Sequence, residues 1–311
     1  MLCRAAEELC LHELLVQRMP SLQVRAQVRS AEMRDVEEVC GGFGAFAMAS
    51  RLRVALFECE RLEEHLAPSV FKRTGGYATL LQRAFDHFST SSESSSLPSI
   101  ELKAFDVKAE QYPADVQQFA GVLISGSLSG VYDKEPWISR LLQEIEILDR
   151  MKVKTCGISF GHQAIVQALG GQVGKNPKGS EVSVRTATLT KAAQQLFGTE
   201  RQDFRLHYHH NDAILRLPDK FWPLASNNVT QHQSVYRPSH FLTFCGHPDY
   251  SHNVEVLERL LEYDRENLWV HEQLVEHGLE TLQQPTDYLW VLKQIVRFYS
   301  GALDRQKPTN V

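Results

Sequence analysis

One serine between two glycines constrains this chain more than any other feature. Residues 155–163 read TCGISFGHQ, with Gly157 and Gly161 two residues before and after Ser159. This is the G-x-S-x-G pattern of a nucleophile elbow, a strand, sharp turn and helix in which glycines allow a close backbone approach. Such an elbow would present the Ser159 hydroxyl at the carboxyl edge of a parallel sheet. An ordinary strand-to-helix turn is the alternative interpretation, because the pattern also arises by chance.

A second stretch supplies the groups that a nucleophilic serine needs. Residues 241–249 read FLTFCGHPD, an apolar strand followed by His247 and Asp249. A serine hydroxyl is a weak nucleophile unless a histidine takes its proton, and a carboxylate orients that histidine. Side chains two residues apart share one face of a strand. The sequence therefore predicts a catalytic triad of Ser159, His247 and Asp249.

Three short motifs together resemble those of class I glutamine amidotransferases. They are the elbow GISFGHQ, the strand end GHPDY, and the loop ISGS at residues 124–127. The resemblance covers roughly residues 52–265. The loop, followed by VYD and PWI at 131–133 and 136–138, most resembles the stand-alone gamma-glutamyl peptidase-like branch. The family nucleophile is a cysteine, whose position Ser159 occupies, and Asp249 stands where the family usually has a glutamate.

The resemblance implies a fold and further site residues. The fold would be α/β, a doubly wound and mostly parallel sheet flanked by helices, of the flavodoxin-like kind seen in class I glutamine amidotransferases. The oxyanion hole would use backbone N–H groups of Gly126 or Ser127 and of Phe160, which must point to where negative charge develops. Gln163 would line the glutamyl pocket. No cofactor and no metal are implied.

The order of the expected elements agrees with that fold. Short apolar runs predict strands near 52–59, 100–107 and 120–124. Helical spacing predicts helices at 77–85 and 137–151, and a serine-rich stretch, 89–99, predicts a flexible loop between them. Alternation predicts a further strand at 181–189.

Two histidines raise a metal-site alternative. His207 and His209 would lie on one side of a strand, but no third ligand is fixed by spacing. The family has a similar, mainly structural stretch here, matched by His210 and Asp212. We therefore expect no metal site and leave these residues out of catalysis.

Charge and composition exclude several classes of partner. A formal net charge of -5 argues against binding to nucleic acid or anionic membranes. No apolar run approaches the roughly 18 residues of a membrane span. The six cysteines form no C-x-x-C pair, so neither a disulfide framework nor a zinc site is indicated. A cytoplasmic enzyme with reduced thiols is expected.

The chain divides into three predicted parts. Residues 1–51 are expected to form a poorly ordered extension, which is too acidic for a transit peptide and lacks a secretory apolar core. Residues 52–265 would form the amidotransferase-like domain. Residues 266–311 would form a helical extension with amphipathic segments at 268–282 and 286–299, the second capped by Thr286. Their apolar faces would cover the domain's own sheet edge, which we favour over a surface for docking a partner.

Two functions follow from these motifs. One is a hydrolase that cleaves glutamine or a gamma-glutamyl amide through an acyl-enzyme on Ser159. The other is a catalytically silent homologue that binds a glutamyl-like ligand or a protein. Retention of His247, an acid at 249 and the oxyanion loop favours the hydrolase. If ammonia is the product, a partner protein must receive it, because the chain carries no synthetase domain; a free-standing hydrolase is the preferred interpretation.

Overall fold

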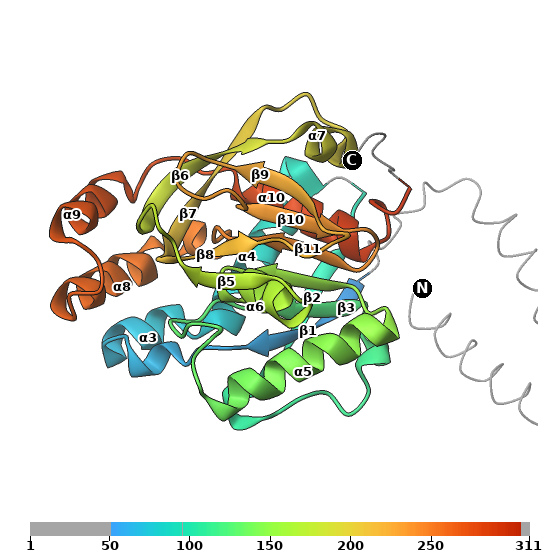
Figure 1. Cartoon of the computed structure of the whole chain (residues 1–311), viewed down its shortest axis with the longest axis horizontal. Coiled ribbons are helices and arrows are strands. Elements are labelled where there is room, and N and C mark those ends of the chain that lie inside the picture. Colours follow the sequence, from blue (N-terminus) through green and yellow to red (C-terminus); the bar gives the residue numbers. More distant parts are fainter. Residues whose placement is uncertain (1–50, 95, 306–311) are drawn as a thin grey trace, which may run out of the picture. The chain divides into compact units, whose positions relative to one another are not determined.

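A computed structural model describes residues 51–94 and 96–305 of the chain. The predicted N-terminal extension lies outside the described residues except for residue 51. The described part is built around a nine-stranded sheet with helices on both sides (Figure 1). No helix among the described residues is long and apolar enough to cross a membrane.

The sheet is parallel in one half and antiparallel in the other. Its order is β2-β1-β3-β4-β11-β10-β9-β6-β7, and the pairs from β2 to β11 are parallel, whereas those from β11 to β7 are antiparallel. A separate antiparallel pair joins β5 to β8. The strands are β1 (Arg51–Glu58), β2 (Ser99–Asp106), β3 (Gly121–Ile124), β4 (Thr155–Ile158), β5 (Gln172–Lys175), β6 (Glu181–Leu189), β7 (Asp203–His210), β8 (Asp212–Arg216), β9 (Trp222–Ser226), β10 (Ser234–Arg237) and β11 (Phe241–Phe244).

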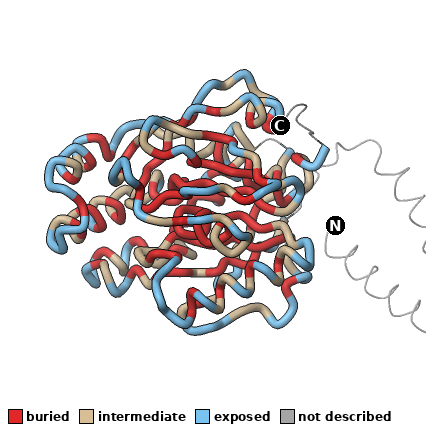
Figure 2. The backbone as a smooth tube through the Cα atoms, viewed as in Figure 1, coloured by how far each residue is buried: buried red, intermediate tan, exposed pale blue. Residues whose placement is uncertain are grey.

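Helices cover both faces because the central strands are apolar on both. Along β1, Val54 and Leu56 point into one core and Ala55 and Phe57 into the other, as the two-residue period of a strand requires. Figure 2 shows this buried centre in red. The helices are α3 (Pro68–Thr74), α4 (Tyr77–Thr90), α5 (Pro136–Met151), α6 (Phe160–Ala168), α7 (Lys191–Phe197), α8 (Val254–Glu266), α9 (Glu272–Thr281) and α10 (Tyr288–Tyr299).

The predicted doubly wound, mostly parallel fold is confirmed. The first five strands in space have the order 2-1-3-4-5 of flavodoxin-like sheets, when β11 counts as the fifth. In such sheets ligands bind beyond the carboxyl ends of the strands. The loops after β1, β3, β4 and β11 all end at that edge, and three of them carry the predicted catalytic and oxyanion groups.

Some local predictions were wrong in detail. The serine-rich stretch is not entirely loop, because α4 continues to Thr90 and a short 3-10 turn follows at Ser92–Ser94. Thr286 does not cap the last helix: the residue before α10 is Asp287, which makes no side-chain cap, while the Thr286 hydroxyl bonds to Ser251 at 2.7 Å. The apolar face of α10 packs into the same core as the central strands.

Candidate active site

Ser159 lies in a strained turn between β4 and α6. Its φ is 52° and its ψ is -108°, a backbone conformation that L-residues adopt at a cost of about 1–3 kcal/mol and that recurs at functional sites. The Ser159 N–H donates to the carbonyl of Phe244 on neighbouring β11 at 2.9 Å, which ties the turn to the sheet. The strand, turn and helix of a nucleophile elbow are thus present at the predicted position.

Both flanking glycines are required by contact with backbone. A Cβ on Gly157 would lie 2.5 Å from the backbone of Gly161, across the turn. A Cβ on Gly161 would lie 2.3 Å from the carbonyl oxygen of Ile124 at the end of β3. No side chain fits at these distances, so the two glycines allow α6 to start directly against β3 and β4.

The loop after β3 is held beside the elbow. The Gly161 N–H donates to the Ser125 carbonyl at 3.1 Å, and the Ser125 hydroxyl accepts from the Cys59 N–H at 2.9 Å. The N–H groups of Gly126 and Ser127 donate to no acceptor among the described residues. The N–H of Phe160, first in its helix, is one of the donors that a helix start leaves free. The predicted oxyanion donors are therefore unpaired among the described residues.

A buried carboxylate that the motifs did not reveal fixes this loop. Glu60, 2% exposed, accepts from the Leu128 N–H at 2.8 Å, the Ser127 hydroxyl at 3.0 Å and the Lys108 ammonium at 2.7 Å. Burial alone would raise the pKa of Glu60, but these bonds lower it below the usual value. The carboxylate therefore remains charged and holds the loop through charge-assisted hydrogen bonds.

His247 and Asp249 form a buried imidazole–carboxylate pair close to the loop. The distance from His247 Nδ1 to Asp249 Oδ1 is 3.3 Å, and the side chains are 2% and 1% exposed. They do not lie on the strand, as the two-residue spacing suggested, because β11 ends at Phe244. His247 is fixed instead by its N–H, which donates to the His207 carbonyl at 2.7 Å, and by its ring, which stacks on Tyr250 with centroids 4.2 Å apart.

Among the described residues, no hydrogen bond joins Ser159 to His247. A Cβ on Gly126 would lie 2.9 Å from His247 Cε1, so the loop after β3 lies directly against the imidazole. Among the described residues, the Ser159 hydroxyl has no hydrogen-bond partner. Catalytic hydrogen bonds are often loose without substrate and tighten only when it binds.

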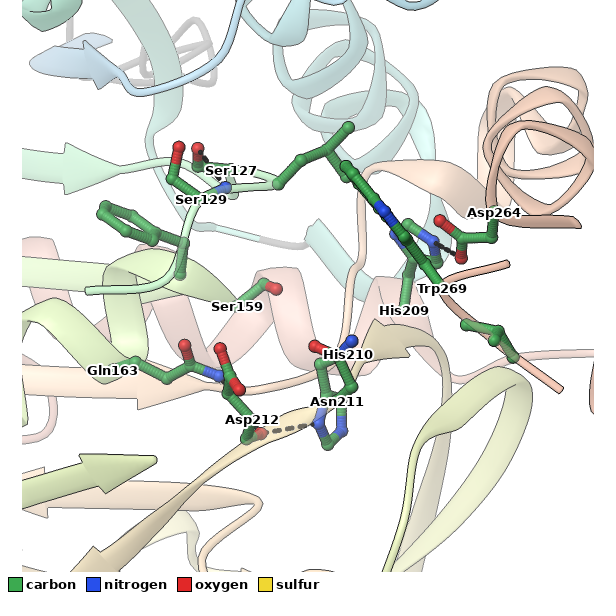
Figure 3. Close-up of a pocket in the computed structure, with 13 residues that line it drawn as sticks. Ser127, Ser129, Ser159, Gln163, His209, His210, Asn211, Asp212, Asp264 and Trp269 are labelled. Carbon is green, nitrogen blue, oxygen red and sulfur yellow. Dashed lines mark hydrogen bonds and ion pairs between the residues drawn. The ribbon is translucent and has the colours of Figure 1, made fainter. Parts of the chain in front are cut away.

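A pocket opens in front of Ser159, and we call it the inner pocket (Figure 3). The Ser159 side chain points toward its centre, and Gln163 lies beside it, its amide donating to the Asp212 carbonyl at 3.3 Å. Its lining residues are Ser127, Leu128, Ser129, Ser159, Phe160, Gln163, His209, His210, Asn211, Asp212, Asp264, Trp269 and Val270. Of the predicted site residues, Ser127, Ser159, Phe160 and Gln163 line the pocket, whereas Gly126, His247 and Asp249 do not.

Two histidines in this wall have acidic partners. His209 Nε2 lies 2.7 Å from Asp264 on α8, and both side chains are buried. His210 lies 3.5 Å from Glu181. Burial disfavours a charged His210, but Cys245 and Glu181 hold its pKa well above the usual value. No sequence motif indicates Asp264, because it reaches His209 from α8, which is distant in sequence.

The histidines considered for a metal site have other partners. His207 Nδ1 lies 3.2 Å from the Ser251 hydroxyl, and its Nε2 lies 2.9 Å from the Leu282 carbonyl, to which it donates. Both ring nitrogens are therefore used within the fold. A different group, Glu60 with Glu64 and His65, has ligand atoms within 4.8 Å of one another, but Lys108 already occupies the Glu60 carboxylate.

A buried histidine in the elbow helix has both ring nitrogens bonded within the fold. His162 is buried, with Nδ1 2.7 Å from the Thr243 hydroxyl and Nε2 3.0 Å from the His232 carbonyl. Burial, together with the neighbouring His232, lowers the pKa of His162 to about 3. The ring therefore stays neutral and braces α6 against β11.

No neighbouring thiol replaces the family cysteine in the described part of the chain. Cys59, Cys156 and Cys245 are free and buried. Burial raises the pKa of Cys59 and of Cys156, which keeps both as unreactive thiols. Ser159 is therefore the residue that stands at the elbow and reaches the inner pocket.

The fold and the elbow together define an amidotransferase-type α/β protein. The family model described as glutamine amidotransferase class-I matches residues 90–261, more than half of the chain. The chain belongs to this family.

Relatives with more specific descriptions are also found. A protein of Schizosaccharomyces pombe described as glutamine amidotransferase-like is 29% identical over 234 residues, covering 72% of this chain and 90% of that protein. Gamma-glutamyl peptidase 3 of Arabidopsis thaliana is 32% identical over 198 residues, covering 60% of this chain and 78% of that protein. The crystal structure of a glutamine amidotransferase from Thermotoga maritima, 16% identical, superposes with a TM-score of 0.60 over 82% of this chain and 98% of that chain. The similarity to this crystal structure supports the fold alone.

Proposed function

We propose that this protein hydrolyses the side-chain amide of glutamine or of a gamma-glutamyl compound, with Ser159 as nucleophile. The observation that carries the proposal is the turn at Ser159, where a left-handed backbone directs an unpaired hydroxyl into the inner pocket. A strained backbone lowers the stability of the folded protein, and such strain is typical of functional sites. The similarity to a gamma-glutamyl peptidase supports the same class of reaction.

The residues would act as follows. Ser159 Oγ attacks the amide carbon while its proton passes to His247 Nε2, the nitrogen that does not face Asp249. The N–H groups near Gly126 and of Phe160 stabilise the oxyanion. His247 then protonates the leaving nitrogen as the C–N bond breaks and a glutamyl ester forms on Ser159. Water, deprotonated by His247, attacks the ester and releases glutamate, and the proton returns to Ser159.

The remaining roles belong to the same proposal. Asp249 holds the imidazole and steadies the imidazolium that forms, and Gln163 orients the glutamyl group in the inner pocket. The substrate is a small molecule. A free-standing hydrolase in the cytoplasm needs no ammonia-accepting partner, and we propose this form.

Trapping the acyl-enzyme tests the proposal. The protein is mixed with glutamine or gamma-glutamylglycine, quenched in acid and measured by intact-protein mass spectrometry. The expected result is a glutamyl adduct that maps to Ser159 and that hydroxylamine removes as the hydroxamate. The silent-homologue alternative predicts no adduct on Ser159 even though the ligand binds, and that result would overturn the mechanism.

A further inference from the structure

A second cleft, which we call the outer cleft, continues from the inner pocket. The two share lining residues from the oxyanion loop, from the turn between β7 and β8, and from the segment after α8; these are Leu128, Ser129, Asn211, Asp212 and Trp269. A gamma-glutamyl amide extends on two sides of its scissile bond. If the glutamyl side lies by Gln163 in the inner pocket, the leaving group must lie outside that pocket. The outer cleft is the space that adjoins the inner pocket and could hold it.

Two half-exposed aromatic side chains line the outer cleft. Trp269 is 49% exposed and Tyr132 is 43% exposed, and both rank among the few large apolar side chains that the described surface presents to solvent. Figure 3 shows Trp269 facing the same open space as Ser159. Large aromatic side chains kept partly in water beside a reactive group are typical of ligand sites.

Both rings are held in place before any ligand arrives. The backbone N–H of Trp269 donates to the Asp264 carbonyl at 2.9 Å, and the Trp269 ring packs edge-on against Tyr263 with centroids 5.4 Å apart. Leu268, just before it, has a left-handed backbone with φ 57°, which turns the chain between α8 and α9. The Tyr132 hydroxyl donates to Asp212 at 2.9 Å. Rigid aromatic walls bind a ligand at a low entropic cost.

Both lysines of the outer cleft are already paired with carboxylates. Lys108 lies 2.7 Å from Glu60, and Lys175 lies 3.0 Å from Asp212. In the described part of the chain, neither lysine is left to attract an anionic leaving group. The cleft therefore favours a neutral, flat group over an anionic one.

Trp269 lies beyond the residues that the family model matches, whereas Tyr132 lies within them. The family model ends at residue 261, eight positions before Trp269. A glutaminase releases ammonia, which fills no cleft.

We propose that the outer cleft is a leaving-group subsite, and that this protein selects gamma-glutamyl amides whose leaving group is an aromatic or other flat apolar amine. The inference rests on the proposed function, because it places the scissile bond at Ser159. The aromatic ring of the leaving group lies against Trp269 and Tyr132, while its nitrogen receives the proton from His247.

Calorimetric binding to Ser159→Ala protein separates this inference from turnover. We expect gamma-glutamylanilide to bind about tenfold more tightly than glutamine, since tenfold corresponds to about 1.4 kcal/mol, the upper range of an aromatic contact. Trp269→Ala and, independently, Tyr132→Ala should each reduce the ratio of the two affinities several-fold. Leu268→Ala, a change at an 89% exposed neighbour that does not line the cleft, is the control and should keep the ratio.

Two outcomes overturn the subsite. One is equal affinity for the anilide and glutamine, and the other is an affinity ratio that both aromatic variants leave unaltered. Tight anilide binding without hydrolysis by the unmodified protein would contradict the proposed function but support the subsite. Hydrolysis of both compounds with equal KM would support the proposed function but contradict the subsite.

Discussion

Replacing Glu60 by glutamine tests how the oxyanion loop is held. Glutamine keeps the shape of the side chain but replaces one carboxylate oxygen by an NH2 group, which cannot accept a hydrogen bond. In one orientation of the amide the bonds from Leu128 and Ser127 to Oε2 are lost, and in the other the bond from Lys108 to Oε1 is lost. Breaking a buried ion pair costs about 3–5 kcal/mol, and we expect the lower end because the Lys108 side chain is 19% exposed. Displacing one oxyanion donor costs about 10²–10³ in kcat.

The assay is kcat for glutamyl release alongside chemical unfolding. The effect should appear in kcat more than in KM, since the loop would bind the oxyanion of the transition state rather than the substrate. Glu64→Gln is the matched control: its side chain is 49% exposed and meets Arg61 at 3.7 Å, a surface pair of about 0–1 kcal/mol. A Glu60→Gln protein that is less stable but has an unchanged kcat would refute the positioning role.

Three further outcomes are expected. Gly161→Ala should abolish turnover and lower the free energy of unfolding by about 1–3 kcal/mol, because the added Cβ would lie 2.3 Å from the Ile124 carbonyl oxygen. Gly174→Ala is the control and should be tolerated, because its Cβ would meet only the end of the Leu215 side chain, at 3.0 Å. Asp249→Asn should reduce kcat by up to about 10⁴ with little change in KM, and a loss below tenfold would contradict its orienting role. The folded protein binds a proton on His162 only near pH 3, whereas the unfolded chain binds it near pH 6.5. Between these two pH values the unfolded chain holds the extra proton, so the free energy of unfolding should fall as the pH decreases, by up to about 1.4 kcal/mol per pH unit. Urea unfolding of His162→Leu at pH 6 and pH 5 should show a shallower fall, and an identical slope would exclude this histidine as the cause.

The sequence predicted the elbow because its geometry is local. Gly157, Ser159 and Gly161 lie within one turn, and the reason for each glycine, a backbone contact closer than any side chain allows, is already implied by the spacing. The doubly wound order followed from apolar runs that alternate with helical segments. The structure confirmed this part of the fold with strand boundaries shifted by about one residue.

The other groups of the site come from long-range contacts that spacing does not encode. Glu60 reaches the oxyanion loop from the end of another strand, and its only local signal is an acidic residue directly after a buried strand at the ligand-binding edge. Asp264 and Trp269 enter from a helix and turn that the motifs do not include. Their roles depend on how α8 packs, which no local pattern fixes.

The most direct test of the account is whether Ser159 supports turnover. Release of glutamate from glutamine and gamma-glutamyl amides is measured for the unmodified protein, Ser159→Ala and Ser159→Cys. The account predicts steady turnover by the unmodified protein, which Ser159→Ala loses. Activity in Ser159→Cys alone would show that the pocket is intact but that the natural serine is silent, and it would contradict the central claim.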